Sequence, residues 1–374
     1  MSSIAVFQDY LAQMGGAERV TEAIHQSLPG ADLVTTMVVP ERISRYLREA
    51  NPKTTWMQKL PRKDKLFRHY FLLYPAAIES APMQSYDLIV SSCCGYAKGV
   101  RRRRDAVHVC YCHTPMRWVW RFSEYTARER FGGATRMALK CMVQGLKQWE
   151  IRAAARPDYY LANSHIVAER LKQAFGVSAH VIEPPIITSR FHISQKQDDY
   201  YLVLSRLQSY KRIDLAIRAC SRTNRRLLVI GDGPDRPRLE ALAGPTVKFL
   251  GRQSDEGVVR LAARCRALIF PGEEDFGMAP LEVNAAGRPS VAYGAGGATE
   301  TIVEGLNGIL FPSQTEDSLI QAMEKLESHS WNPAASRRLA MRYVIEGCQD
   351  RLLSFLATVS PVTRQRPAAR RTAA

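Results

Sequence analysis

Residues 267–287 read ALIFPGEEDFGMAPLEVNAAG. The apolar run Ala267–Phe270 is typical of a buried strand, and Pro271-Gly272 ends that strand at once. Because proline is tolerated in the first turn of a helix, Pro280 predicts a helix that starts near Ala279. The stretch is therefore a strand, a short acidic loop and a helix, which is the repeating unit of an α/β protein with a parallel sheet.

The same alternation of short apolar runs and helical patterns extends over the rest of the chain. In the first half, strands are predicted at 4–7, 32–38, 88–91, 107–112 and 159–162, and helices at 17–27 and 165–175. In the second half, strands are predicted at 200–205, 226–230, 247–250, 267–270 and 290–293, and helices at 213–221, 235–243, 254–264 and 278–286. We expect an α/β protein with two Rossmann-like domains that face each other across a cleft, where ligands bind at the carboxyl ends of the strands.

A proline pair marks the boundary between the two cycles. The segment 183–187 reads Glu-Pro-Pro-Ile-Ile, and consecutive prolines neither continue a helix nor join a central ladder. We therefore expect domains at 1–185 and 186–358, with the last helix able to pack back on the first domain. The basic segment 359–374 is predicted to be a disordered tail.

The chain is strongly basic, which favours anionic partners. Its 374 residues carry a formal charge of +16 and give a pI near 9.6. The cluster Arg62-Lys63-Asp64-Lys65 is followed by aromatic and aliphatic residues up to Tyr74, a pattern that suits an anionic membrane surface. The run Arg101–Arg104 is the best feature for a nucleic-acid partner, and either cluster also fits a solvated face.

Targeting and cysteine patterns point to the cytoplasm. The N-terminus enters an apolar strand at Ile4 without the features of a secretory signal, and no apolar run approaches a membrane span in length. Eight cysteines are scattered, and neither Cys93-Cys94 nor Cys110-x-Cys112 has the spacing of a structural zinc site. We expect reduced thiols and no metal site.

Two acidic residues flank the start of the predicted helix at 278–286. Glu274 lies on the loop after the strand, and Glu282 lies in the first helical turns. Backbone N–H groups at a helix start attract phosphates, and carboxylates accept hydrogen bonds from sugar hydroxyls. The pair therefore fits a sugar diphosphate, although acids also occur near helix starts simply because they complement the helix dipole.

The spacing of these residues resembles a known signature. Two glutamates separated by seven intervening residues around Phe276-Gly277, with Pro-Leu-Glu and Ala-x-Gly after them, resemble the signature of family 4 retaining glycosyltransferases, which have the GT-B fold. The segments 287–292, 296–300 and 304–308 continue the pattern. The resemblance covers nearly the whole chain and implies an acceptor-binding first domain and a second domain that binds a nucleotide-sugar donor.

The resemblance assigns roles to residues of the second domain. It implies that Glu282 binds the ribose, that Glu274 contacts the donor sugar, and that Arg206 and Lys211 neutralise the diphosphate. The glycine that commonly precedes this arginine is Ser205 here, which is a departure from the family pattern. The other donor-binding residues expected in this domain are Gly231, Gly233, Arg252, Phe276, Gly277 and Met278.

Two motifs of the first domain complete the expected site. Gly15-Gly16 follows the first strand and starts a helix, so a ligand can approach its backbone and an anion is favoured there. His113 ends another strand, and the resemblance places the matching histidine against the donor sugar. We expect Glu274, His113, Arg206 and Lys211 to surround the reacting groups.

The longer motif around His113, with Met116-Arg117-Trp118 after it, resembles a subgroup that makes bacterial surface polysaccharides. This implies transfer of mannose from GDP-mannose to a polyprenyl-diphosphate-linked or oligosaccharide acceptor. It also implies a cytoplasmic enzyme at the inner face of the plasma membrane. Since Arg206 and Lys211 would supply the charge of a divalent cation, we expect no cofactor and no metal requirement.

Four other functions remain open from the sequence. A sugar-nucleotide epimerase or a phosphorylase could share the architecture. A nucleic-acid-binding protein would explain the basic charge but not the Glu274 segment, and we expect no nucleic-acid partner. A membrane scaffold without catalysis would tolerate the loss of Arg206 and Lys211, both of which are present.

Overall fold

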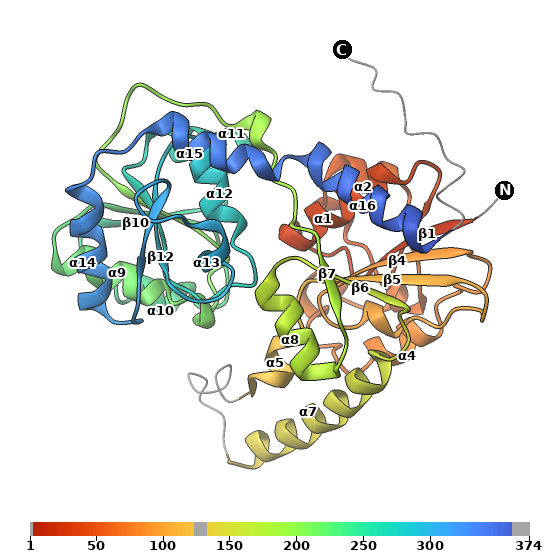
Figure 1. Ribbon diagram of the computed structural model, residues 1–374. Helices are drawn as coiled ribbons and strands as arrows, with labels where there is room; N and C mark the ends of the chain where they lie inside the picture. The colour runs from red at the N-terminus through yellow and green to blue at the C-terminus, as the bar shows by residue number, and fades with distance from the viewer. Residues whose placement is uncertain (1–2, 123–132, 361–374) are drawn as a thin grey trace.

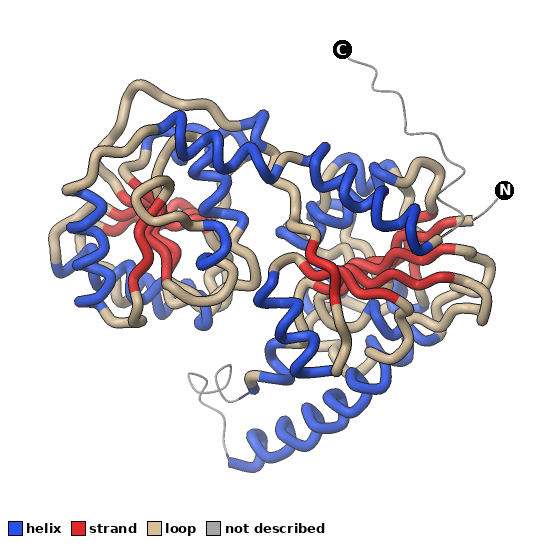
Figure 2. Tube along the Cα trace, viewed as in Figure 1, coloured by secondary structure: helices blue, strands red, loops and turns tan. Residues whose placement is uncertain are grey.

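The computed structural model describes residues 3–122 and 133–360, which form two α/β domains (Figures 1 and 2). The first sheet contains β1 (Ile4–Gln8), β2 (Asp32–Thr35), β3 (Lys53–Thr54), β4 (Leu88–Cys93), β5 (Val107–Cys112), β6 (Tyr159–Ala162) and β7 (Ala179–Val181). Its strand order is β3-β2-β1-β4-β5-β6-β7, and the paired strands are parallel. The helices assigned to the first half of the chain are α1 (Gly16–Ser27), α2 (Arg45–Glu49), α3 (Lys63–Leu66), α4 (Tyr74–Glu79), α5 (Arg117–Trp120), α7 (Gly133–Ala153) and α8 (His165–Phe175).

The second sheet is also parallel. It contains β8 (Tyr201–Leu204), β9 (Leu227–Ile230), β10 (Val247–Gly251), β11 (Ala267–Phe270), β12 (Ser290–Tyr293) and β13 (Gly308–Phe311), in the order β10-β9-β8-β11-β12-β13. The helices that follow the linker are α9 (Ile213–Arg222), α10 (Arg236–Glu240), α11 (Asp255–Arg264), α12 (Met278–Ala285), α13 (Ala298–Thr301), α14 (Glu316–Glu327), α15 (Pro333–Ala340) and α16 (Ile345–Val359). The predicted pair of Rossmann-like domains is confirmed.

Each sheet is covered on both faces, which explains its continuous apolar strands. In the first domain, alternate residues of β1 enter different clusters, since Ala5 and Phe7 pack on one face and Ile4 and Val6 on the other. In the second domain, two further clusters cover the faces of its sheet. Figure 2 shows the strands of each domain surrounded by helices.

The chain crosses between the domains twice. The linker after β7 contains only a short 3₁₀ turn, Thr188–Arg190, and the Ile186 N–H donates to the Tyr343 carbonyl on the return crossing, at 2.7 Å. Beyond that crossing, α16 packs against the first domain, where its residues Cys348 and Leu352 share a cluster with β1 and α1 (Figure 1). The predicted tail at 359–374 overlaps the end of α16, and residues 361–374 lie outside the described residues.

Local differences from the predicted elements have clear causes. The strand predicted at 32–38 ends at Thr35, because residues 36–39 leave the sheet and pair with the loop at Leu11 through backbone hydrogen bonds. Strands β3, β7 and β13 were not predicted, since two to four residues carry little periodic pattern. None of the helices in residues 3–122 and 133–360 is long and apolar enough to cross a bilayer.

The strand order places the cleft. In the first sheet the order reverses direction between β1 and β4, and in the second between β8 and β11. Loops that follow such neighbouring strands diverge to opposite faces and leave a crevice at the carboxyl edge of the sheet. The loops after β1 and β5 and those after β8, β9 and β11 carry most of the residues predicted to act.

Candidate functional site

The loops after β8 and β11 bring two predicted residues into direct contact. Lys211 ends a 3₁₀ turn after β8, and its ammonium group forms an ion pair with the Glu274 carboxylate. The side chains are only 15% and 13% exposed. A Cβ on Gly272 would lie 2.9 Å from the Lys211 backbone, so glycine is required there for the loops to meet. Burial holds the pKa of Lys211 below its ordinary value, although Glu274 opposes this shift.

The predicted glycines Gly231 and Gly233 support the loop that carries Arg206. Gly231 has a φ of +127°, and a Cβ there would lie 1.8 Å from the Ser205 carbonyl oxygen. A Cβ on Gly233 would lie 2.2 Å from the carbonyl oxygen of Leu207. Since a side chain at either position would displace that loop, both glycines act by allowing two backbones to approach.

The start of α12 places three more predicted residues. Gly277 precedes the helix with a φ of +93°, and Glu282 lies one turn inside it, with one carboxylate oxygen 3.8 Å from Arg19 of the first domain. Burial raises the pKa of Glu282, and Arg19 opposes this shift. The ring of Phe276 is 4% exposed and packs against Tyr343, so it stabilises the domain junction instead of lining the cleft.

The Gly15-Gly16 loop lies across the cleft from the start of α12. A Cβ on Gly16 would come within 2.9 Å of the Met278 sulfur atom, so the two predicted residues touch from opposite domains. The Gly15 N–H donates to the buried carboxylate of Glu18 at 3.0 Å, which fixes the loop. Burial raises the pKa of Glu18, while Arg206 is one of the groups that oppose this shift.

His113 is held in one orientation by a chain of polar side chains. Its Nε2 lies 2.9 Å from the Ser92 hydroxyl, and that hydroxyl contacts Thr21, which also contacts Gln8. Burial lowers the pKa of His113 to about 4, so the imidazole is neutral at physiological pH. Ser92 is the only hydrogen-bond partner of the ring among the described residues, which leaves Nδ1 for a ligand.

Arginines of the first domain hold the acidic loop of the second. Arg117, at the start of α5, pairs with Asp275 at 2.7 Å and lies 3.9 Å from Glu274. Arg170 on α8 pairs with Asp275 at 2.6 Å and also with Glu273, whose carboxylate is shared with Arg121. The acidic loop therefore joins the domains, and Glu274 is held from both sides of the cleft.

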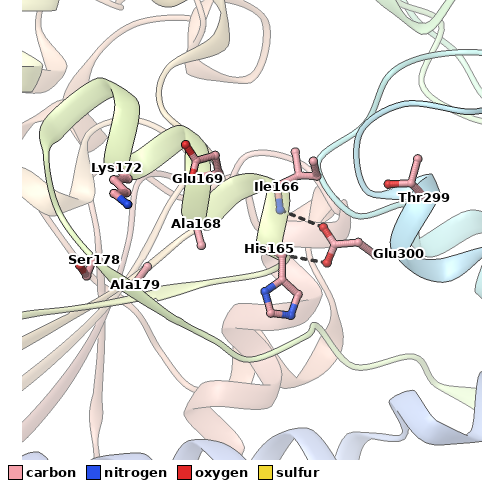
Figure 3. A pocket seen from close by; sticks show the side chains of 9 residues that line it. All are labelled: His165, Ile166, Ala168, Glu169, Lys172, Ser178, Ala179, Thr299 and Glu300. Atoms are coloured by element: carbon pink, nitrogen blue, oxygen red, sulfur yellow. Dashed lines mark hydrogen bonds between the residues drawn. The ribbon is translucent and has the colours of Figure 1, made fainter.

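A second contact between the domains lies at the start of α8 (Figure 3). The Glu300 carboxylate from α13 accepts hydrogen bonds from the His165 and Ile166 N–H groups, each at 2.9 Å. Ser164, the N-cap of this helix, donates to the Asp275 carbonyl at 2.6 Å. A helix N-terminus after a strand commonly binds a phosphate. Here a carboxylate of the other domain occupies that position and fastens the two domains together.

The fold thus gathers most of the predicted residues, with two exceptions. Phe276 is turned into the core, and Arg252 lies exposed after β10, two strands away from β8. The sequence analysis assigned no role to several residues that complete the site. These residues are Glu18, Arg117, Arg121, Arg170, Glu273, Asp275 and Glu300. The adjacent acids Glu273 and Asp275 were visible as a charge run, whereas nothing local marks Arg121 or Arg170.

Three cysteines meet in the core of the first domain. The sulfur atoms of Cys93, Cys110 and Cys112 lie within 4.8 Å of one another, and all three side chains are buried. Cys93 faces Cys112 because β4 and β5 pair at this register, so it separates from its neighbour Cys94. Three thiolates can hold a soft metal ion, but buried thiols also pack as small apolar groups. The absence of a metal site therefore stays a prediction.

Comparisons with known proteins identify the family of the chain. The family model described as Glycosyltransferase Family 4 matches residues 14–190, and that described as Glycosyl transferases group 1 matches residues 187–342. The chain is 27% identical over 188 residues to the D-rhamnosyltransferase WbpZ of Pseudomonas aeruginosa. The matched region covers 47% of this chain and 49% of the relative. It is also 27% identical over 190 residues to the O-antigen chain mannosyltransferase C of Escherichia coli, and this match covers 48% of this chain and 50% of the relative. With human alpha-1,3/1,6-mannosyltransferase ALG2, 26% identity extends over 61% of each chain.

The chain therefore spans about half to three fifths of the length of these relatives.

Solved structures match over nearly the whole chain. A sucrose-phosphate synthase from Thermosynechococcus elongatus has a TM-score of 0.73 at 16% identity, with 96% of this chain and 99% of that one covered. HepE of Anabaena, in complex with UDP and glucose, has a TM-score of 0.69 at 18% identity, with 96% and 100% covered. The two family models together span residues 14–342, and the chain belongs to the family 4 glycosyltransferases with the GT-B fold.

Proposed function

We propose that this glycosyltransferase moves a hexose, with mannose from GDP-mannose as the first candidate, to a lipid-linked or oligosaccharide acceptor in bacterial polysaccharide synthesis. The observation that carries the proposal is the group of Lys211, Glu274 and Arg117, which stands where the two domains meet. The names of two relatives support the donor and the pathway class, since they describe a GDP-mannose-dependent alpha-mannosyltransferase and an O-antigen chain mannosyltransferase.

The charges of the cleft suit the departure of a nucleoside diphosphate. As the bond to the anomeric carbon breaks, negative charge grows on the diphosphate, and preorganised cations stabilise it. Lys211 and Arg206 lie on the same loop system after β8 and can supply that charge without a divalent ion. We propose that the enzyme needs no metal or other cofactor, with the nucleotide sugar as its donor.

The surroundings of Glu274 and His113 favour transfer with retention of configuration. Glu274 is held by Lys211 and lies near Arg117, so its negative charge is already compensated and it is a poor nucleophile. The acceptor hydroxyl attacks from the face that the diphosphate leaves, and the departing phosphate oxygen takes the hydroxyl proton. The neutral His113 ring contributes a hydrogen bond to a sugar hydroxyl through Nδ1. Glu274 orients the sugar.

Nucleic-acid binding fits the structure less well than sugar transfer. The run Arg101–Arg104, the best feature for nucleic acid, is largely neutralised, since Arg101, Arg102 and Arg103 pair with acidic residues. A strong, salt-dependent affinity for RNA or DNA without nucleotide-sugar binding would favour that function instead. An epimerase or phosphorylase is separated from a transferase by detecting transfer of the sugar to a second molecule.

We also propose that the enzyme works at the inner face of the plasma membrane. The segment from α3 to the start of α4 exposes the apolar side chains of Leu72 and Leu73, and Arg62 and Lys65 at α3 are exposed as well. A basic surface with apolar tips attracts anionic headgroups and inserts shallowly. Co-sedimentation should show binding to vesicles that contain anionic lipid and little binding to neutral vesicles; equal binding to both would refute this location.

The central test measures donor binding and transfer. Melting temperatures are compared with GDP-mannose, GDP, UDP-glucose and UDP, because a ligand that binds only the folded state stabilises it by about 2.7 kcal/mol at a hundred times its Kd. We expect the largest rise in melting temperature with GDP-mannose, and transfer of mannose to a lipid-linked acceptor. The NMR coupling at the anomeric carbon of the product should show that the product keeps the anomeric configuration of the donor. No rise with any of the four compounds would refute the proposal.

A further inference from the structure

A buried ion pair in the first domain lies outside the group of residues predicted to act. The Lys98 ammonium group and the Glu150 carboxylate are 2.6 Å apart, and both side chains are 0% exposed. Replacing such a pair by apolar residues of similar volume is often neutral or even stabilising, because taking both charges out of water is costly. Stability alone therefore does not account for the pair, and its other hydrogen bonds indicate a different role.

The Glu150 carboxylate holds both ends of the short helix α5. Glu150 lies near the end of α7, and its Oε1 accepts a hydrogen bond at 3.0 Å from the N–H of Met116, which directly precedes α5. Its Oε2 accepts a hydrogen bond at 2.8 Å from the indole N–H of Trp120, the last residue of α5. A helix of only four residues is not stable by itself, so its placement depends on contacts such as these.

Lys98 holds the carboxylate in that orientation. Its ammonium group donates to Glu150 and also to the Gly95 carbonyl oxygen, each at 2.6 Å, so the lysine joins the loop after β4 to α7. The two elements approach closely, since a Cβ on Gly99 would lie 2.6 Å from the Trp149 ring. The core of the first domain therefore sets the position of the Glu150 carboxylate.

The helix that Glu150 holds carries Arg117 into the cleft. Arg117 is the first residue of α5 and follows Met116 directly, and its side chain is 13% exposed. Its guanidinium group pairs with Asp275 at 2.7 Å and lies 3.9 Å from the Glu274 carboxylate. A shift of α5 would move this cation relative to Glu274, and the attraction between two charges depends on the distance between them.

We propose that Glu150, with Lys98 as its counter-ion, is a positioning residue for sugar transfer that acts through α5 to keep Arg117 against Glu274. Glu150 itself is buried in the first domain and touches no substrate. The inference rests on the proposed function, which assigns Glu274 to the donor sugar, and it adds a residue on which that assignment depends.

Trp120→Phe is the probe for this role. Removing Glu150 itself would leave the Lys98 charge buried and unpaired, which destabilises the fold whatever else it does. Trp120→Phe removes only the indole N–H that donates to Glu150, and it keeps an aromatic ring in the core. We expect kcat for sugar transfer to fall about tenfold, because a hydrogen bond to a charged group is lost and α5 is released at one end. The KM for the donor should stay within about threefold of the wild type, because α5 carries none of the residues assigned to the nucleotide.

Trp149→Phe is the matched control. Its indole N–H also donates to a carboxylate at 2.8 Å, but that carboxylate belongs to Glu79 on α4 and does not hold α5. The two substitutions therefore remove the same kind of hydrogen bond from the same domain. We expect Trp149→Phe to keep kcat within about twofold of the wild type, since the position of Arg117 does not depend on it.

A double-mutant cycle with Arg117→Gln shows whether the effect passes through Arg117. If it does, Trp120→Phe lowers kcat about tenfold in the wild type and less than about twofold in the Arg117→Gln background, whereas independent effects multiply. Rates are measured below the melting temperature of every variant, with the nucleotide sugar that gives the wild type its highest turnover. The same cycle measured on the melting temperature needs no substrate, and there the loss in the double variant should be smaller than the sum of the two single losses.

Three results would overturn the inference. Trp120→Phe and Trp149→Phe could change kcat by the same factor, the effects of Trp120→Phe and Arg117→Gln could multiply, or Arg117→Gln could keep the wild-type kcat. A wild type that transfers a sugar other than mannose would refute the proposed donor and leave this comparison intact. If the wild type transfers no sugar, the proposed function fails, and additive losses in the melting-temperature cycle would then overturn the inference separately.

Discussion

The ion pair between Lys211 and Glu274 gives the sharpest test of the site. Lys211→Gln removes the positive charge and keeps a polar side chain of similar reach. Arg212→Gln is the matched control, because it removes a positive charge at the next residue. Arg212 points elsewhere, with hydrogen bonds to Asp214 at 3.3 Å and Gln314 at 3.0 Å.

The size of the effect follows from burial and from the remaining neighbours. Removing one partner of a buried ion pair costs about 3–5 kcal/mol, since the other charge stays desolvated. Glu274 keeps 13% of its side-chain exposure and has Arg117 at 3.9 Å, so we expect a loss in unfolding free energy of about 2–3 kcal/mol. Turnover should fall further, because losing one group that stabilises the departing charge costs about 10²–10³-fold.

The assay separates these two effects. Urea unfolding measures the stability of each variant, and initial rates of sugar transfer are measured well below the melting temperature with donor and acceptor saturating. We expect Lys211→Gln to be folded and to lose about 10²–10³-fold in kcat, while Arg212→Gln stays within about twofold of the wild type. A folded Lys211→Gln variant with kcat within threefold of the wild type would refute the role of Lys211 in leaving-group stabilisation.

Four further predictions use other parts of the structure. Because the pKa of His113 is about 4 when folded and 6.5 when unfolded, the unfolded state gains a proton first as pH falls. When the pH is lowered from about 7.5 to about 4.5, the unfolding free energy of the wild type should therefore fall by about 2–3 kcal/mol more than that of the His113→Gln variant. An equal fall in both proteins, measured by urea titration, would contradict the burial of His113. Gly231→Ala should lower the unfolding free energy by at least about 2 kcal/mol, since its Cβ meets the Ser205 carbonyl at a positive φ; an unchanged urea midpoint would argue against that packing. Glu300→Ala should loosen the domains and raise the radius of gyration in solution scattering, whereas Glu304→Ala, whose partners Leu310 and Lys325 lie in its own domain, should not. Activity should persist in excess chelator, and a strict need for a divalent ion would contradict the assignment of the leaving-group charge to Arg206 and Lys211.

The residues that the sequence analysis placed correctly in space share one property. Lys211, Glu274, Gly16 and His113 each lie within eight residues after the end of a strand, and the carboxyl ends of parallel strands lie at one edge of their sheet. Chain position alone therefore brings them to the cleft. Phe276 shows the limit of this argument, because a loop residue can turn its side chain inward, and here the ring packs against Tyr343.

The residues that the sequence analysis missed are partners across the two domains. Arg170 and Asp275 are separated by 105 residues, and Glu300 meets the start of α8 from more than 130 residues away. Charged side chains such as these carry no periodic signal, and a solvated arginine has the same local sequence pattern as a paired one. Their pairing depends on how the domains close.

The alternation of apolar strands and helical patterns, the prolines at 184–185 and the segment 267–287 are local features, set by which side chains must be buried along the chain. They were sufficient to predict two parallel sheets, a linker and a cleft with Glu274 on its edge. Only the tertiary structure showed that Glu274 is held by Lys211 and Arg117 together. The physical reason is that electrostatic pairing depends on distance in space, and domain closure sets that distance.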